Sequence, residues 1–225
     1  MITIVCVLKT GVFDKHEHAN KEAAVCSLHA GHVQFLYRQC LRKIERPFRF
    51  VCLTNLDFIH GIETIKLSHN WQGWWSKLEL FKKGQFSKDE KIIYIDLDTA
   101  ILGNIDDILD YDHKFTTLDN ISHPRSGDIG SGIMAWKGDY SYLYETFKEK
   151  PNFYMQDCVT SRNWGDQGFI KNHLGFEPEK FQFLFSGIYS HRKDFIDKKP
   201  LPYTRIAIFN GDPKPWDLDV DWLKH

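Results

Sequence analysis

The segment that most constrains this chain is KIIYIDLDTAI, residues 91–101, in which an apolar run ends abruptly in two acids. Residues 92–95 are β-branched or aromatic, as in a buried strand, and Asp96 and Asp98 follow with one residue between them. Carboxylates at the end of a buried strand cost free energy unless a positive group meets them. Hard divalent cations bind such oxygens and commonly serve to hold phosphate groups. The segment therefore predicts a sheet edge that binds a divalent cation and, through it, a phosphate.

The composition is that of a soluble globular protein and argues against some classes of partner. Of the 225 residues, 42% are apolar, and 29 basic residues nearly balance 30 acidic ones. A balanced charge does not favour nucleic acid or an anionic membrane as the main partner. The first apolar run, ITIVCVL, has no basic leader and is too short for a signal peptide or a membrane span.

The cysteines indicate a reducing compartment. Cys6, Cys26, Cys40, Cys52 and Cys158 are odd in number and include no Cys-x-x-Cys pair. Cys6 and Cys52 lie in predicted strands, where a thiol behaves as a small apolar side chain. We therefore predict a cytoplasmic protein whose cysteines are buried thiols.

The order of strands and helices predicts an α/β protein with one domain, residues 1–225. Strands are expected at 2–8, 48–54, 63–67, 91–95, 115–118, 131–136 and 205–209, and helices at 29–45, 74–83, 102–109, 139–149 and 164–174. Strands and helices alternate in the first half, which favours a sandwich with a mainly parallel central sheet. The strand at 2–8 is apolar on both faces, as central parallel strands are.

Three loops that follow predicted strands carry groups suited to a diphosphate. They are Lys9-Thr10-Gly11, the segment 96–98, and the segment 210–214, which reads Asn-Gly-Asp-Pro-Lys. In open α/β sheets, ligands lie beyond the carboxyl ends of the strands. Acids that hold a cation, lysines that add positive charge and glycines that allow close backbone approach suit a metal-bound diphosphate. We therefore expect the three loops to meet at one edge of the sheet.

Five segments, taken in order, resemble a known family. IIYIDLDTAI (92–101) resembles the Asp-x-Asp strand of GT-A glycosyltransferases, and GWWSKLELF (73–81) resembles the lysine-bearing helix before it. SGIMAW (131–136), GDQGFI (165–170) and FNGDPKPW (209–216) resemble the donor-facing strand, the Asp-Gln helix and the C-terminal Gly-x-x-Lys-Pro-Trp loop. Together they resemble family 8 of the glycosyltransferases, the glycogenin-like group, and its small bacterial and viral relatives, from residue 2 to about residue 217.

The resemblance implies a Rossmann-like GT-A fold and a metal-dependent transfer from a nucleotide sugar, most often a UDP-sugar, to a glycan or other hydroxyl acceptor. It implies Mn²⁺ or Mg²⁺ as the cofactor and retention of the anomeric configuration, although an inverting enzyme would use Asp166 as a general base. The implied roles are metal binding for Asp96 and Asp98, nucleoside contacts for Leu8 and Thr10, diphosphate contacts for Lys77, Gly211 and Lys214, sugar contacts for Ser131 and Gly132, and catalysis for Asp166 and Gln167.

The last motif departs from the family pattern at the third metal ligand. The family usually has a histidine one or three residues before the glycine of this motif, where this chain has Asn210 and Ile208. Ile208 cannot bind a cation, whereas the amide oxygen of Asn210 suits Mn²⁺ or Mg²⁺. We therefore predict either a metal site of Asp96, Asp98 and Asn210 that binds weakly and depends on the donor, or a water molecule where the histidine would be. Gly130 stands where the family favours asparagine, which leaves the donor sugar open.

Two other functions remain as alternatives. A non-catalytic module that binds nucleotide sugars or glycans is favoured by the missing histidine. A phosphatase of the haloacid dehalogenase type also begins with an apolar strand that ends in Asp-x-Asp. That class needs Thr or Val four residues after the first acid, and this chain has Ala100 there.

Some aromatic and histidine residues have simpler structural explanations. Trp71, Trp74 and Trp75 would suit a platform on which an acceptor sugar stacks, but core packing explains at least one of them. His29 and His32 are one helical turn apart, as zinc ligands can be, yet no cysteine or acid at a fitting distance joins them. We expect both histidines to face solvent.

Overall fold

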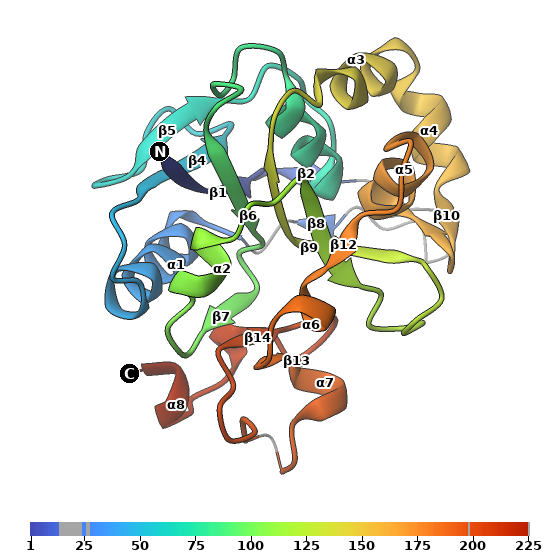
Figure 1. Cartoon of the computed structure of the whole chain (residues 1–225). Coiled ribbons are helices and arrows are strands. Elements are labelled where there is room, and N and C mark those ends of the chain that lie inside the picture. The colour runs from blue at the N-terminus through green and yellow to red at the C-terminus, as the bar shows by residue number, and fades with distance from the viewer. Residues whose placement is uncertain (14–23, 26–27, 198, 225) are drawn as a thin grey trace.

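In the computed structural model, which describes residues 1–13, 24–25, 28–197 and 199–224, a central sheet lies between two layers of helices (Figure 1). Its seven strands lie in the order β12 (Glu179–Lys180), β8 (Phe115–Asp119), β9 (Ile129–Lys137), β6 (Lys91–Ile95), β1 (Ile2–Leu8), β4 (Arg49–Thr54) and β5 (Glu63–Lys66). β6, β1, β4 and β5 are parallel neighbours. The predicted α/β fold with a mainly parallel sheet is confirmed.

The direction of β9 was not predicted. β9 runs antiparallel to both of its neighbours, β6 and β8. Only residues 120–128 connect β8 to β9, and a parallel connection needs a crossover of about a dozen residues or more. Pro124 and Gly127 in this connection are turn-forming residues, so the chain reverses here instead of crossing over.

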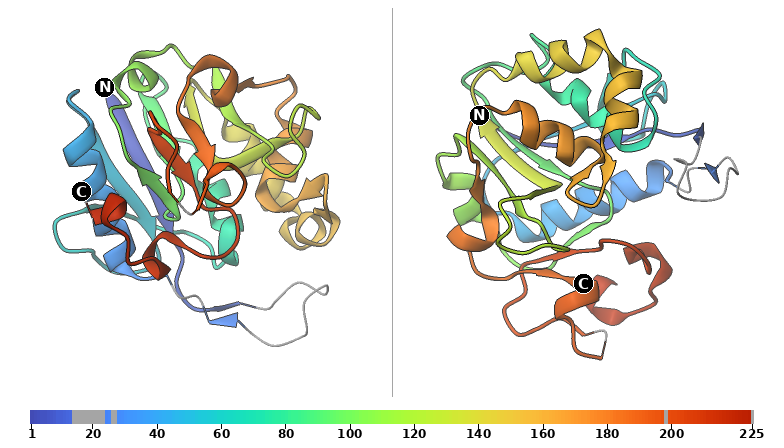
Figure 2. Two further views of the ribbon diagram at one scale, coloured as in Figure 1. Left: turned by 90° about the horizontal axis from the view of Figure 1, so that it is seen from below. Right: turned by 90° about the vertical axis from the view of Figure 1, so that its right-hand side faces the viewer.

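The sheet is buried on both faces, as the apolar pattern of residues 2–8 predicted. Ile4 and Cys6 of β1 belong to one core cluster, and Val5 and Val7 belong to the other. Helix α1 (Ala30–Lys43) packs into the first cluster. The 3₁₀ helix η1 (Gly73–Phe81), α3 (Ser141–Glu149) and α5 (Gly165–His173) pack into the second. Figure 2 shows α1 and α3 on opposite sides of the strands.

A second sheet contains the last predicted strand, and this corrects its expected position. β14 (Ile206–Ile208) pairs with β13 (Ile188–Ser190) and with β7 (Thr99–Ile101), and it is not part of the central sheet. β7 leaves the central sheet directly after Asp98 and pairs antiparallel with β14. The backbone N–H of Phe209 then donates to the carbonyl oxygen of Asp98 over 3.2 Å. The second sheet therefore brings the loop after residue 208 against the turn after β6.

The remaining elements are short. They are β2 (Val12–Phe13), β3 (Ala24–Val25), α2 (Asp106–Asp110), α4 (Pro151–Asp157), β10 (Val159–Thr160), β11 (Asn163–Trp164), α6 (Phe181–Leu184), α7 (His191–Asp194), η2 (Pro215–Asp217) and α8 (Asp221–Lys224). Four cysteines are buried and carry free thiols, and Cys26 lies outside the described residues. Within the described ranges, no helix has the length and apolar character needed to cross a membrane.

Candidate active site

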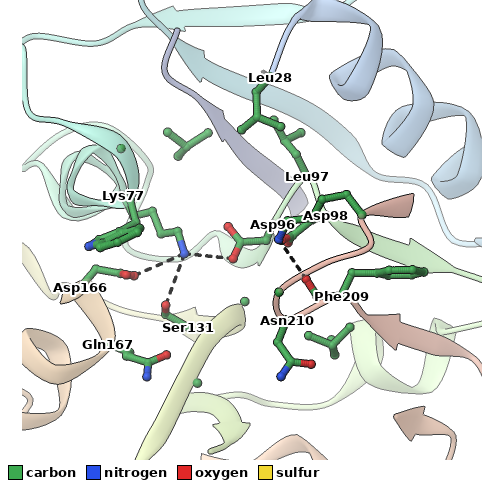
Figure 3. A pocket seen from close by; sticks show the side chains of 18 of the residues that line it. Leu28, Lys77, Asp96, Leu97, Asp98, Ser131, Asp166, Gln167, Phe209 and Asn210 are labelled. Atoms are coloured by element: carbon green, nitrogen blue, oxygen red, sulfur yellow. Dashed lines mark hydrogen bonds and ion pairs between the residues drawn. The ribbon is translucent and has the colours of Figure 1, made fainter. Parts of the chain in front are cut away.

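A cavity of about 870 Å³ opens at the edge of the sheet where β1 and β6 end (Figure 3). Pockets of roughly 300–1,000 Å³ hold small-molecule ligands. Its walls come from segments far apart in the sequence, with Lys9, Asp96, Asp98, Ser131, Gly132, Asp166, Gln167, Asn210, Gly211 and Lys214 among the lining residues. The loops that follow residues 8, 95 and 209 therefore meet at one place, as predicted.

The two acids line the cavity on either side of Leu97, whose side chain is almost fully buried. Leu97 is 3% exposed and packs in the same core cluster as α1. The N–H of Asp96 donates to the carbonyl oxygen of Gly132 over 2.8 Å, and the carbonyl oxygen of Asp96 accepts from the N–H of Thr99 over 3.1 Å. These bonds form the turn that ends β6, and they hold both carboxylates at the sheet edge.

Lys77 extends from η1 into a group of acids. Its Nζ lies 3.0 Å from Asp96 Oδ2, 3.4 Å from Asp166 Oδ2 and 3.3 Å from Ser131 Oγ. Burial by itself lowers the pKa of Lys77, but the carboxylates of Asp166 and Asp96 outweigh burial and raise the pKa above its ordinary value. Lys77 is therefore charged at neutral pH. The dashed lines of Figure 3 show that Lys77, which belongs to η1, contacts Asp96 after β6, Ser131 of β9 and Asp166 of α5.

Lys214 makes the corresponding contact with the second acid. Its Nζ lies 2.5 Å from Asp98 Oδ2 and donates to the carbonyl oxygen of Phe209 over 3.2 Å. Burial raises the pKa of Asp98, the neighbouring charge of Asp96 raises it further, and Lys214 offsets only part of this effect. Each of the two acids is thus paired with one lysine at the edge of the cavity.

Asp166 and Gln167 lie at the start of α5 and complete the far wall of the cavity. Asp166 is 4% exposed, and burial raises its pKa although Lys77 acts in the opposite direction. Within the part of the chain that the structure describes, Asp166 Oδ2 has no hydrogen-bond partner besides its ion pair with Lys77. The ion pair with Lys77 therefore compensates the buried Oδ2 atom.

The two carboxylates fit a hard divalent cation, whereas the third predicted ligand is directed elsewhere. Asn210 Oδ1 accepts a hydrogen bond of 2.7 Å from Ser190 Oγ. Figure 3 shows the Asn210 amide pointing away from Asp96 and Asp98. Among the described residues, no group of three or more His, Cys, Asp or Glu side chains could hold a metal ion. A cation held by Asp96 and Asp98 would complete its coordination with phosphate oxygens and water.

Two residues predicted to contact the nucleoside do not line the cavity. Leu8 is fully buried in the core cluster beneath α1. Successive side chains of a strand point to opposite faces, so Val7 and Lys9 line the cavity in place of Leu8. The N–H of Thr10 donates to Asn55 Oδ1 over 2.8 Å, which ties the loop after β1 to the loop after β4.

The predicted glycines and serine do line the cavity. Gly211 has a φ of +90°, a conformation that favours glycine, and it lies in the loop that carries Lys214. A side chain at position 132 would begin 3.6 Å from Asp96 Oδ2, so Gly132 keeps the space beside the acid open. Ser131 adds a hydroxyl group on the same strand.

One histidine that was expected to face solvent lies in the cavity wall instead. His32 does not face solvent as expected, because it is 7% exposed and stacks on Trp216 with ring centroids 4.0 Å apart. Burial, with a smaller contribution from His29, lowers the pKa of His32 to about 4. His32 is therefore neutral at pH 7.

Trp164 also lines the cavity, although it was not identified from the sequence. Its position directly before the Gly-Asp-Gln segment was the signal that could have identified it.

Comparisons with known proteins support the fold. No protein-family model and no curated protein matches the sequence. Among solved structures, the glycosyltransferase GlyE of Streptococcus pneumoniae TIGR4 has a TM-score of 0.60 and 12% identity, over 96% of this chain and 56% of GlyE. An active-site mutant of LgtC has a TM-score of 0.61 and 12% identity, over 96% of this chain and 90% of LgtC.

A further structure shows the galactosyltransferase LgtC in complex with donor and acceptor sugar analogues, with a TM-score of 0.59 and 13% identity over 96% of this chain and 90% of that one. The chain thus spans little more than half of GlyE and nearly all of LgtC. It has the GT-A glycosyltransferase fold, as predicted. Its membership of family 8 stays a prediction.

Proposed function

We propose that the protein is a glycosyltransferase that transfers a sugar from a nucleotide sugar, a UDP-sugar, to a hydroxyl group of a glycan or other acceptor. The observation that carries this proposal is the arrangement of two acids and two lysines at the edge of a cavity of about 870 Å³. Acids that would hold a cation, flanked by lysines, match the needs of a diphosphate leaving group. The resemblance to LgtC, which was crystallised with donor and acceptor sugar analogues, agrees with this proposal.

The chain's own residues have distinct roles in the proposed reaction. A divalent cation bound by Asp96 and Asp98 would neutralise charge on the leaving diphosphate. Lys77 and Lys214, which now contact these acids, would turn toward phosphate oxygens when a donor binds. Asp166, which lines the cavity, would accept a hydrogen bond from a sugar hydroxyl. Gln167 would steady the positive charge that develops on the sugar.

The proposed reaction retains the anomeric configuration. Asp166 is ion-paired with Lys77 at 3.4 Å, so it is already engaged with a cation inside the site. Following the anomeric proton of the product by NMR would distinguish the two outcomes. An inverted product would reassign Asp166 as the general base.

A non-catalytic module that binds nucleotide sugars is the second candidate, favoured by the contact of Asn210 with Ser190 in place of a third metal ligand. A screen of nucleotide sugars with Mn²⁺ separates the candidates. Slow hydrolysis of one donor in the absence of an acceptor would support the transferase and identify its donor. Donor binding without any turnover would favour the binding module. The dehalogenase-type phosphatase loses its support, because the chain has the GT-A fold.

Calorimetric titration with UDP and Mn²⁺ tests the role of the acids. We expect Asp98→Ala to weaken UDP binding at least about tenfold, a loss of about 1.4 kcal/mol, because one ligand of the cation is removed. EDTA should weaken binding to the wild-type protein to a similar extent. Asp57→Ala is a control, since Asp57 forms an exposed ion pair with Lys66. Unchanged affinity in Asp98→Ala would contradict the proposed metal site.

A further inference from the structure

Two tryptophans in the cavity wall are exposed and lie side by side. Trp74 is 37% exposed and Trp164 is 38% exposed, and both line the cavity. Their ring centroids are 6.1 Å apart, and their planes are inclined by 44°. By contrast, Trp71 and Trp75 are 8% and 1% exposed and belong to the core. Only Trp74 of the three predicted platform residues is therefore placed to contact a ligand.

The position of Trp74 is built into the fold. A Cβ atom at position 165 would lie 2.6 Å from Trp74 Nε1, and Gly165 also has a φ of +57°. Glycine at this position lets the Trp74 indole lie directly against the backbone at the start of α5. The next residue, Trp75, stacks on Phe147 with centroids 5.1 Å apart and anchors η1. Trp74 is thus preorganised between two elements.

The tryptophan pair lies beside the groups assigned to the donor sugar. Side chains three residues apart eclipse one another in a 3₁₀ helix, so Trp74 and Lys77 share one edge of η1. Lys77 contacts Asp166, which is two residues after Trp164. His32 and Trp216 form the wall on the α1 side of the sheet, whereas Trp74 and Trp164 come from the η1 and α5 side. The pair is therefore near the proposed reacting centre.

We propose that Trp74 and Trp164 form the acceptor subsite and that the acceptor is a glycan that presents a pyranose ring to them. A pyranose has a face of C–H groups that packs on an aromatic ring and an edge of hydroxyl groups. Amphipathic tryptophans offer the matching apolar face, and the adjacent Asp166 and Gln167 offer polar groups. The inference rests on the proposed function, since it names the substrate of the same site.

The experiment measures how sugars change donor consumption and tryptophan fluorescence. The probes are methyl glycosides of glucose, galactose and N-acetylglucosamine, with sorbitol as an open-chain polyol and N-acetyltyrosinamide as a phenolic acceptor. The variants are Trp74→Ala, Trp74→Phe and Trp164→Ala, with Phe58→Ala as a control because Phe58 is 76% exposed and lies outside the cavity. Each protein is tested with the donor identified by hydrolysis and with Mn²⁺.

We expect one of the glycosides to accelerate donor consumption with saturation and sorbitol to have no such effect. Trp74→Ala and Trp164→Ala should raise the apparent KM for that glycoside about tenfold. Trp74→Phe should keep most of the affinity because it keeps a ring. Phe58→Ala should leave both donor hydrolysis and this KM within about twofold of wild type. In the tryptophan variants, the rise in KM for the glycoside should exceed any change in donor hydrolysis measured without acceptor, which separates an acceptor contact from general damage to the site.

The outcomes distinguish this inference from the proposed function. If the tryptophan variants keep the wild-type KM for the glycoside, the acceptor subsite is wrong and the transferase stands. If N-acetyltyrosinamide saturates and no glycoside does, the acceptor is not a glycan. If wild type consumes no donor but a glycoside changes its fluorescence and Trp74→Ala abolishes that change, the transferase fails while the sugar subsite stands. If no glycoside acts in either measurement, the subsite is overturned.

Discussion

At the scale of single residues, the site is organised by buried charges that compensate one another. Lys77 has a side chain that is 9% exposed and contacts both Asp96 and Asp166. A buried cation of this kind is unfavourable alone, and so are the buried carboxylates. Each buried charge is stabilised by its oppositely charged neighbours. Removal of any one of these side chains should therefore destabilise the protein.

Removing the charge of Lys77 should therefore destabilise the protein. We expect Lys77→Met to lower the free energy of unfolding by about 3–5 kcal/mol at pH 8, because it leaves two carboxylates without their cation. Lys77→Arg keeps the charge and should cost clearly less. The deficit of Lys77→Met should shrink as the pH falls and Asp166, whose pKa is already raised, becomes protonated. Urea unfolding at several pH values measures this, and equal stability of Lys77→Met and wild type would contradict it.

At the scale of elements, short irregular segments position the site while regular elements support it. The 3₁₀ helix η1 carries Lys77, and a turn after β6 presents the acids. Among the supporting contacts, His113 joins α2 to β8. Its ring nitrogens lie 2.8 Å from the carbonyl oxygen of Ile108 and 2.7 Å from Thr116 Oγ1, and the residue is 1% exposed. Burial lowers the pKa of His113 to about 4.

This contact predicts a loss of stability in mild acid. The unfolded chain takes up a proton at His113 near the ordinary pKa of about 6.5, whereas the folded chain does so only near 4. The contribution of His113 to stability is therefore fully present above about pH 6.5 and is lost between pH 6.5 and 4, by about 2 kcal/mol at pH 5. Urea unfolding of wild type and His113→Gln at pH 8 and pH 5 tests this. His113→Gln should be less stable at pH 8 but should lose less on acidification, and identical losses would exclude His113 as the cause.

At the scale of the whole molecule, the cavity exists because two sheets meet. The central sheet supplies β1, β6 and β9, and the smaller sheet supplies the loop after β14 (Figure 1). The hydrogen bond from Phe209 N–H to the carbonyl oxygen of Asp98 joins the two sheets at the cavity. Ligand binding at this junction should therefore affect segments that are remote from one another in the sequence.

Hydrogen exchange should reveal this junction. We expect UDP with Mn²⁺ to slow amide exchange together in residues 96–98, 131–132 and 209–214, since these segments line one cavity. β5, at the far edge of the sheet, should exchange at an unchanged rate. Mass spectrometry of peptic fragments measures both. Protection of only one of the three segments would show that they do not bind the ligand jointly.

The sequence alone determined the features that depend on local pattern. The apolar run of β1, the periodic spacing of α1 and the abrupt change at Asp96 depend only on neighbouring residues, so their structures were predictable. The order of the short motifs likewise indicated the GT-A fold, because proteins that share a fold carry the elements around the site in the same order along the chain.

The tertiary structure decided what depends on contacts between distant segments. The place of β14 in a second sheet follows from its pairing with β13 and β7, which local pattern does not specify. The contact of Asn210 with Ser190 joins two loops, and the pairing of Trp74 with Trp164 requires η1 and α5 to pack together. Such contacts depend on how elements that are far apart in the sequence pack against one another. The residues next to each contact in the chain do not determine that packing.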